Sequence, residues 1–78
     1  MEARMKIGQA WAVTPPVDCD ICNRPLMRTF VDGRTRDGRW AIMCPLCRLM
    51  EGREQLGTGL GQKFERKAGG GPWLKTAG

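Results

Sequence analysis

The chain has 78 residues, of which 13 are basic and 8 acidic, so its formal net charge is +5. Chains this short usually need disulfides, a metal or a partner for stability, and three tryptophans with two phenylalanines are too few large apolar side chains for a self-sufficient core. The sequence has neither the roughly 18 consecutive apolar residues of a membrane span nor an N-terminal export signal. We therefore expect one cytoplasmic domain whose four cysteines stay reduced.

The first 16 residues are expected to form an N-terminal arm, because Pro15-Pro16 favours extended backbone and cannot continue a helix. Trp11 lies in this arm and has two interpretations. It is either an aromatic side chain folded back over the small core or an anchor for a partner, since tryptophan is enriched among residues that dominate binding energy. The folded domain itself is expected over residues 17–67.

A β-hairpin is expected in the middle of the chain, with strands over residues 26–31 and 39–43. Between them lie two Asp-Gly pairs, at 32–33 and 37–38. Glycine accepts a positive φ and aspartate tolerates it, so such pairs are strong turn formers. In the second strand Trp40 and Ile42 share one face, and we expect Trp40 to lie in the core.

The last third of the chain contains weaker signals. Residues 48–56 predict a short helix, although Gly52 disfavours its middle. The glycine-rich stretch 57–61 predicts an irregular loop, and it fits neither the Walker A motif nor the dinucleotide fingerprint. Residues 62–67 predict a final short strand or helical turn. The tail at 68–78, which includes Trp73, is expected to be flexible.

Two cysteine pairs of the form Cys-x-x-Cys are separated by 21 residues. Two intervening residues let the backbone turn tightly enough for both sulfurs of a pair to face one point, and a hairpin can bring two such pairs together. Zinc accepts four thiolates in a tetrahedron, and pairs separated by about 15–20 residues are typical of zinc sites. The predicted ligands of one structural Zn²⁺ are Cys19, Cys22, Cys44 and Cys47.

Two other uses of the cysteines are open. An iron tetrathiolate, as in rubredoxin, would carry electrons, although rubredoxin-type knuckles normally have a glycine soon after the second cysteine, where this chain has Asn23 and Arg48. A thiol–disulfide enzyme would need a βαβ scaffold that the chain is too short to supply. Four cysteines close the zinc coordination shell, and no histidine is present as a general base. We therefore expect neither enzymatic activity nor a small-molecule substrate.

The knuckles CDIC and CPLC, with the hairpin FVDGRTRDGRWAIM between them, resemble a zinc-ribbon or treble-clef zinc finger. A strand follows the second knuckle in a ribbon and a helix in a treble clef, and RLMEGRE favours the helix. The stretch is also similar to short proteins encoded by bacteriophages and prophages, which would place the chain in the host cytoplasm. The resemblance implies a small metal-stabilised α+β fold with flexible termini. Zinc ribbons bind nucleic acid, RNA polymerase, ribosomes or other proteins, so the fold does not choose a function.

Arginine is concentrated around the predicted hairpin, and its planar fork matches phosphate and carboxylate geometry. The candidate partner-binding residues are Arg28, Arg34, Arg36, Arg39 and Arg48, together with Trp11. Zinc held by four thiolates lowers the net charge to about +3, which fits nucleic acid or an acidic protein surface. These arginines can equally form a solvated face.

Two functional hypotheses follow. In the first, the arginine-rich hairpin binds nucleic acid or acts within a nucleic-acid machine. In the second, a phage-type protein docks on a host protein and modulates or inhibits it through Trp11, the glycine-rich loop or the tail. An iron electron carrier is the third and weakest hypothesis.

Overall fold

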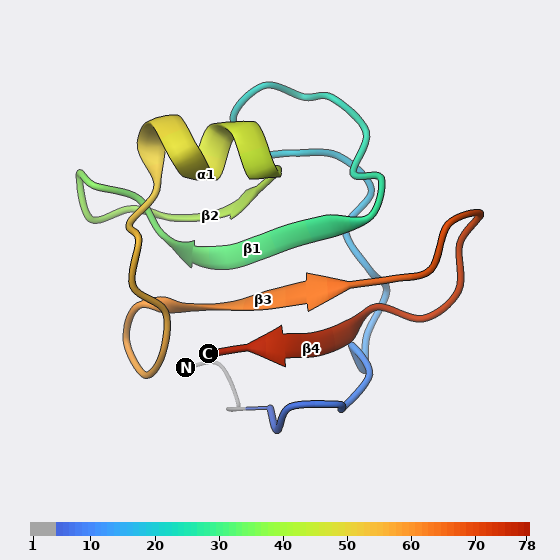
Figure 1. Ribbon diagram of the computed structural model, residues 1–78. Helices are drawn as coiled ribbons and strands as arrows, with labels where there is room; N and C mark the ends of the chain where they lie inside the picture. Colours follow the sequence, from blue (N-terminus) through green and yellow to red (C-terminus); the bar gives the residue numbers. More distant parts are fainter. Residues whose placement is uncertain (1–4) are drawn as a thin grey trace.

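The computed structural model describes residues 5–78. Its four strands form one antiparallel sheet in the order β2-β1-β3-β4, and one short helix contacts β1 and β2 (Figure 1). In chain order the elements are β1 (Thr29–Arg34), β2 (Trp40–Met43), α1 (Pro45–Glu51), β3 (Gly61–Glu65) and β4 (Leu74–Ala77). The expected small α+β fold is therefore confirmed at the level of one sheet and one short helix. No helix within residues 5–78 has the length and apolar character needed to cross a membrane.

The hairpin between the cysteine pairs is present, but its turn is shorter than predicted. Asp32 and Gly33 lie inside β1 rather than in the turn. Gly33 faces Gly61 of β3, and a Cβ on Gly33 would come within 2.7 Å of the Leu60 carbonyl oxygen. Glycine is therefore needed here for close strand packing. The turn is closed later, where the Thr35 N–H donates to the Arg39 carbonyl oxygen at 2.7 Å.

β1 starts later than predicted because the segment before it belongs to the first cysteine loop. The Leu26 N–H donates to the Val17 carbonyl oxygen at 2.8 Å, so residues 26–28 are held by this loop and pairing with β2 begins at Val31. Residues 61–65 form the strand that the sequence left undecided between strand and helical turn, and β3 lies beside β1 in the sheet.

The two faces of the central strand carry different side chains. Because alternate residues point to opposite faces, Phe30 and its partner Phe64 lie on one face, and Val31 and its partner Met43 on the other. All four are buried. Trp73 completes the aromatic face, with its ring edge-on to Phe30 at 4.8 Å between centroids. Each face therefore has its own apolar packing, and β1 is shared by both.

The prediction that Trp40 lies in the core is wrong. Its side chain is 41% exposed, whereas Trp73, expected in a flexible tail, is 3% exposed. The opposite face of β2 packs on the core, because Ala41 and Met43 are its buried residues. The Trp40 indole N–H donates to Asp32 Oδ1 at 2.5 Å, so this ring is fixed at the rim of the sheet.

The prediction of flexible termini is wrong for the described residues. The tail forms β4, which pairs with β3, and the arm continues the sheet beyond β4 (Figure 1). The Gly8 N–H donates to the Lys75 carbonyl oxygen at 2.8 Å, and the Trp11 N–H to that of Trp73 at 2.9 Å. Arm and tail therefore cover each other's backbone groups, which would otherwise leave an open sheet edge. The part of the predicted arm before residue 5 lies outside the described residues.

The helix is earlier and shorter than the predicted span 48–56. α1 begins at Pro45, because proline at the first helical position loses no hydrogen bond. It ends at Gly52, whose N–H donates to the Arg48 carbonyl oxygen. A Cβ on Gly52 would come within 2.7 Å of that oxygen. The glycine that disfavoured the middle of the predicted helix is therefore its C-terminal cap.

Candidate metal centre

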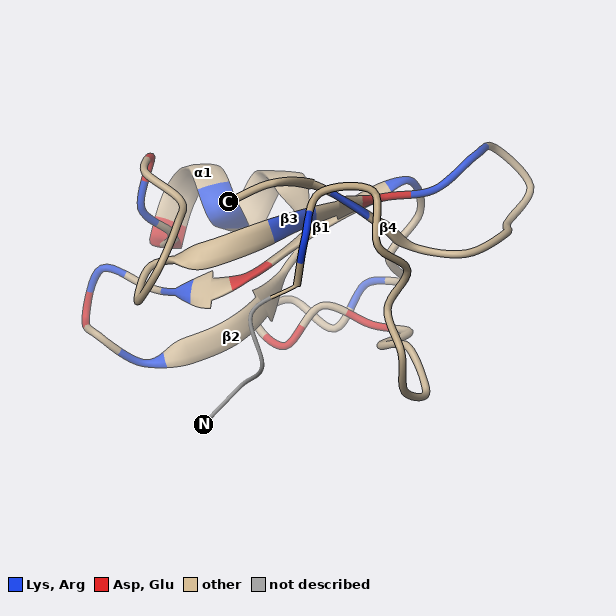
Figure 2. Cartoon of the chain, turned by 90° about the horizontal axis from the view of Figure 1, so that it is seen from below, with Lys and Arg blue, Asp and Glu red and all other residues tan. Residues whose placement is uncertain are grey.

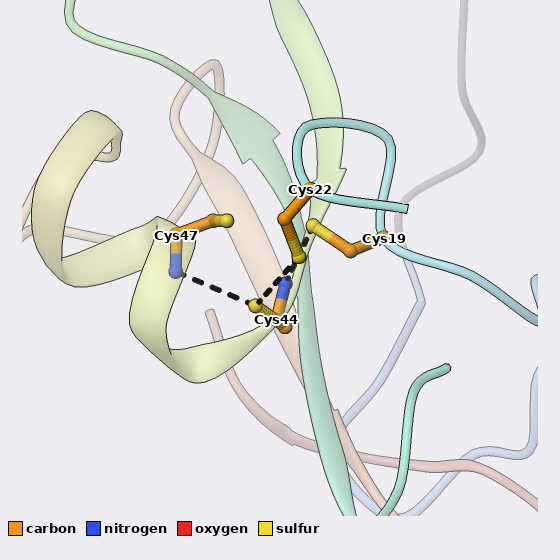
Figure 3. Close-up of side chains that lie close together, drawn as sticks. All are labelled: Cys19, Cys22, Cys44 and Cys47. Carbon is orange, nitrogen blue, oxygen red and sulfur yellow. Dashed lines mark hydrogen bonds between the residues drawn. The ribbon is translucent and has the colours of Figure 1, made fainter. Parts of the chain in front are cut away.

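The four predicted metal ligands converge at one point of the structure (Figure 3). Their Sγ atoms all lie within 4.8 Å of one another. Cys19 and Cys22 come from the loop before β1, Cys44 follows β2, and Cys47 lies in the first turn of α1. Hairpin formation therefore carries the second pair back to the first.

The first knuckle is shaped by local hydrogen bonds. The Cys19 N–H donates to the Arg24 carbonyl oxygen at 2.9 Å, and the Asn23 N–H donates back to the Cys19 carbonyl oxygen at 3.0 Å. The Ile21 N–H is aimed at Cys19 Sγ at 3.4 Å. Asn23 has φ of 62°, a left-handed conformation that asparagine tolerates better than most residues. It thus performs the turn for which rubredoxin-type knuckles use glycine.

The second knuckle is the start of the helix. Cys44 is the N-cap of α1, and its Sγ accepts the Cys47 N–H at 3.4 Å. The Arg48 N–H donates to the Cys44 carbonyl oxygen at 2.9 Å. A cysteine sulfur thus stands where a serine or aspartate oxygen usually caps a helix. The helix start fixes the direction of both sulfurs of this pair.

The two knuckles are also bonded to each other. The Cys44 N–H points at Cys19 Sγ at 3.4 Å (Figure 3). Asp20 and Ile42 are joined twice: the Asp20 N–H donates to the Ile42 carbonyl oxygen at 2.9 Å, and the Ile42 N–H donates to Asp20 Oδ2 at 2.8 Å. This pairing places the first knuckle against the outer edge of β2. The cluster is therefore positioned by the backbone as well as by the sulfurs.

The electrostatics of the cluster favour a thiolate at Cys19. Burial raises the pKa of this thiol, but N–H groups of Cys22, Cys44 and Ile21 point at its sulfur and lower the pKa from 9.0 to about 7. The pKa of Cys47 is raised, first by burial and then by the neighbouring sulfurs. Removing protons from four adjacent thiols therefore requires a positive charge among them, which a divalent metal supplies.

The sulfur geometry fits a tetrahedral metal better than disulfides. A tetrahedron with Zn–S bonds of about 2.3 Å has sulfurs about 3.8 Å apart, and Cys22 Sγ lies 3.8 Å from Cys44 Sγ. A disulfide needs about 2.05 Å, and all four cysteines are free. Cys19 and Cys47 are buried, whereas Cys22 lies at the surface. The donor set is that of a closed structural metal site.

The structure separates one of the predicted partner-binding arginines, Arg28, from those around the hairpin turn. Arg28 precedes β1 and Arg34 ends it, so the two lie about 20 Å apart at about 3.3 Å per residue. Around the hairpin turn, Asp37 stands between Arg36 and Arg39 in the chain, as the succession of blue, red and blue in Figure 2 shows. Arg39 Nε lies 3.0 Å from Asp37 Oδ2.

Several of these arginines hold loops together through backbone carbonyl oxygens. Arg28 Nε donates to the oxygen of Arg66 at 3.2 Å, and Arg34 Nη1 to that of Gly38 at 2.8 Å. The Arg36 guanidinium donates to the carbonyl oxygen of Gly52 at 3.1 Å. The Arg48 guanidinium donates to that of Glu54 at 2.9 Å. These contacts give each side chain a local structural role.

Trp11 lies over the aromatic face of the sheet. Its ring is edge-on to Phe64 at 4.9 Å and to Phe30 at 5.6 Å between centroids. This placement matches the interpretation of Trp11 as a cover for the core. Its role as a partner anchor stays a prediction.

One surface feature is missing from the sequence-based prediction: an apolar stripe on the outside of α1. Leu46, Leu49 and Met50 are 54%, 74% and 60% exposed. Their i, i+3, i+4 spacing was the available signal. It was hidden because the helix was expected to begin after Cys47.

Comparisons with protein-family models, with curated proteins and with solved structures find no match to this chain. The resemblance to zinc-ribbon and treble-clef proteins, and to phage-encoded proteins, therefore rests on the residues of the knuckles and the hairpin alone. The geometry supports a cluster of four cysteines within metal-binding distance.

Proposed function

We propose that this chain is a non-enzymatic module in which one structural zinc ion fixes the two knuckles, the hairpin and α1 as a platform for a macromolecular partner. The observation that carries the proposal is the convergence of all four Sγ atoms within 4.8 Å. Four thiolates fill the zinc coordination shell and leave no position for water or substrate, so the metal's role is architectural. A helix that begins inside the second knuckle favours the treble-clef variant over the ribbon.

Zinc is preferred to iron on the basis of the donor set and its surroundings. Tetrahedral sulfur sites accept either metal. The lack of glycine after the first knuckle no longer separates the two metals, because Asn23 adopts the left-handed backbone that glycine would supply. The second knuckle does distinguish zinc from iron. It continues directly into α1 and thus lacks the turn of a rubredoxin-type loop. A colourless, metal-loaded protein would exclude iron.

A protein partner fits the surface better than nucleic acid does. The hairpin arginines donate to backbone carbonyl oxygens or pair with Asp37, and Arg28 lies at the opposite end of β1 from the other three. In contrast, α1 presents three exposed apolar side chains to solvent, and such patches mark interaction sites. Nucleic-acid binding by Arg28, Arg34, Arg36, Arg39 and Arg48 is the second proposal, supported by the net charge of +5.

Metal analysis combined with chelation tests the proposed function. Structural zinc binding is worth about 10–16 kcal/mol in small zinc fingers, and the net stability of a domain is about 5–15 kcal/mol. We expect one zinc per chain, and loss of the dispersed amide resonances when a strong chelator removes it. Amide resonances that stay dispersed without metal would contradict the proposal.

Salt dependence tests the nucleic-acid alternative. Phosphate contacts release counterions, so affinity for DNA or RNA should fall by about one log unit per log unit of salt for each contact. Replacing Arg36 and Arg39 by glutamine should reduce this slope by about two. If oligonucleotides bind without a salt dependence, or do not bind at all, the alternative is wrong.

A further inference from the structure

The outer face of α1 has the pattern of a buried helix face but lies in solvent. Leu46, Leu49 and Met50 follow i, i+3, i+4 spacing and so form one stripe. In a surface helix such a stripe normally turns toward the core. Here the inward position is taken by Cys47, which is buried at the metal cluster. The metal site thus anchors the helix from the inside and leaves its apolar stripe exposed.

A cleft of about 580 Å³ adjoins this stripe, and Met50 belongs to both. Ile21 from the first knuckle and Trp40 from β2 are among its apolar walls. The Trp40 ring is held in place by its hydrogen bond to Asp32 and by the Arg34 guanidinium 5.4 Å from its centre. A wall fixed before binding lowers the entropy lost on association. The stripe and the cleft together form what we call the helix–cleft surface.

Three carboxylates and two guanidinium groups line the cleft, so its own side chains sum to −1. Arg39 is paired with Asp37, and the Arg36 guanidinium donates to backbone carbonyl oxygens at the end of α1. Asp20 and Glu51 also line the cleft. The Glu51 side chain has no hydrogen bond or ion pair to any residue from 5 to 78. An aromatic ring beside two carboxylates is a setting that suits a lysine or arginine side chain.

The distribution of charge over the whole chain points the same way. Residues 17–27 and 34–56 contain the knuckles, β2, α1 and the Arg34 guanidinium beside Trp40, and they have six basic and five acidic side chains. A zinc tetrathiolate adds −2, so this part of the chain sums to −1 when the metal is bound. Most of the +5 excess of the chain lies in the remaining residues. A partner at the helix–cleft surface should therefore be positive.

We propose that the helix–cleft surface binds a basic, amphipathic segment of a partner protein. Apolar side chains of the segment pack on Leu46, Leu49 and Met50, and a lysine or arginine enters the cleft between Trp40 and the carboxylates of Asp20 and Glu51. This proposal rests on the proposed function, because the bound zinc both orients α1 and supplies the negative charge. The three apolar residues provide affinity, and the carboxylates select the sign of the partner's charge.

Two synthetic amphipathic helical peptides test the proposal. They share one leucine stripe and carry either lysine or glutamate on its flanks. Each is titrated into the full, zinc-loaded chain while amide and indole N–H resonances are followed by NMR. The lysine peptide should bind about tenfold or more tightly than the glutamate peptide, with shifts in α1 and in the Trp40 indole N–H. Equal or tighter binding of the glutamate peptide, shifts confined to β3 and β4, or no saturable shift would overturn the proposal.

Matched variants separate the surface from general hydrophobicity. Leu49→Ser should weaken the lysine peptide about tenfold, whereas Ile7→Ser, which removes an aliphatic side chain of similar exposure (69% against 74%) from the arm, should not change it. Glu51→Lys should weaken the lysine peptide and strengthen the glutamate peptide. Equal effects of Leu49→Ser and Ile7→Ser would contradict the docking site.

The same spectra distinguish other occupants and separate this proposal from the proposed function. Concentration-dependent shifts in α1 of the free chain would indicate a second copy, and shifts there on adding an oligonucleotide would indicate nucleic acid. Either result would overturn the proposal. A chain that keeps its fold after chelation would instead contradict the structural role of zinc, and the peptide titration of the zinc-loaded chain would still be decisive for the surface.

Discussion

Asn23 supplies the tight turn of the first knuckle with its left-handed backbone, and no other non-glycine residue from 5 to 78 has a positive φ. For most residues other than glycine and asparagine, this conformation costs about 1–2 kcal/mol. Asn23→Ala should therefore lower the free energy of unfolding of the zinc-loaded chain by about 1 kcal/mol, and Asn23→Gly should leave it nearly unchanged. Urea denaturation measures both. Equal stability of the alanine and glycine variants would show that the turn does not need this conformation.

Asp37 organises the hairpin turn and gives it a pH dependence. Its carboxylate accepts hydrogen bonds from the Thr35 hydroxyl and the Arg39 N–H, and with the Arg39 charge these lower the pKa of Asp37 below 3.8. A carboxylate with a lowered folded pKa stabilises the fold above its unfolded value, and this stabilisation is lost as the pH falls through the folded value. The turn should therefore loosen only below about pH 4.

An NMR titration of the side-chain carboxyl carbons measures the pKa of Asp37. Thr35→Val removes the strongest hydrogen bond and should raise this pKa toward 3.8. Thr58→Val, at an exposed threonine in the glycine-rich loop, should not change it. A pKa that does not respond to Thr35→Val would contradict the assigned cause.

At the scale of elements, β4 and the arm hold the aromatic face together. Trp73 is 3% exposed and contacts Phe30 and the Arg66 guanidinium, which lies 4.3 Å from the centre of its ring. Trp73→Ala should cost about 3–5 kcal/mol. Trp40→Ala, at the 41% exposed tryptophan, should cost less than half of that. Thermal unfolding of the two zinc-loaded variants makes the comparison, and a larger loss at Trp40 would reverse the assignment of the core.

The elements show why the sequence predicted the site better than the fold. The ligand spacing and the hairpin depend on local chemistry that can be read along the chain. The fates of Trp40 and Trp73 depend on which strand lies beside which, and the sequence carries no local record of that. Gly33 is the clearest case: it has the pattern of a turn, but its function is to let β3 approach, as shown by Gly61 opposite it.

The helix shows a different cause of error. Pro45 and Gly52 are both standard terminal residues, but the predicted helix begins only after the second cysteine pair, whereas α1 includes Cys47. Because Cys44 belongs to the sulfur cluster and is also the N-cap of α1, the helix and the knuckle overlap. The boundary and the apolar stripe were missed for the same reason.

At the scale of the whole molecule, β1 belongs to both apolar layers, because it carries Phe30 on one face and Val31 on the other. Metal-dependent folding predicts how the number of protons released by zinc binding changes with pH. A cluster that kept its geometry without metal would hold the Cys19 thiol at a pKa of about 7, so this thiol would be mostly protonated at pH 6 and mostly deprotonated at pH 8. In an unfolded chain the pKa of Cys19 has its ordinary value of 9.0, and the thiol stays mostly protonated at both pH values. Between pH 6 and pH 8 the contribution of Cys19 should therefore fall by nearly one proton in a preformed cluster and very little in an unfolded chain.

Calorimetric titration in buffers of different ionisation enthalpy gives this count. Because the thiols must lose protons to bind, affinity should fall as the pH is lowered. A count that falls by about one proton or more from pH 6 to pH 8 would show that the knuckles are preformed and would contradict metal-dependent folding.

X-ray absorption at the zinc edge of the purified, zinc-loaded chain examines the central claim most directly. The account predicts four sulfur neighbours at about 2.3 Å, with Cys19, Cys22, Cys44 and Cys47 as their source. A first shell that contains nitrogen or oxygen, or fewer than four sulfurs, would contradict it.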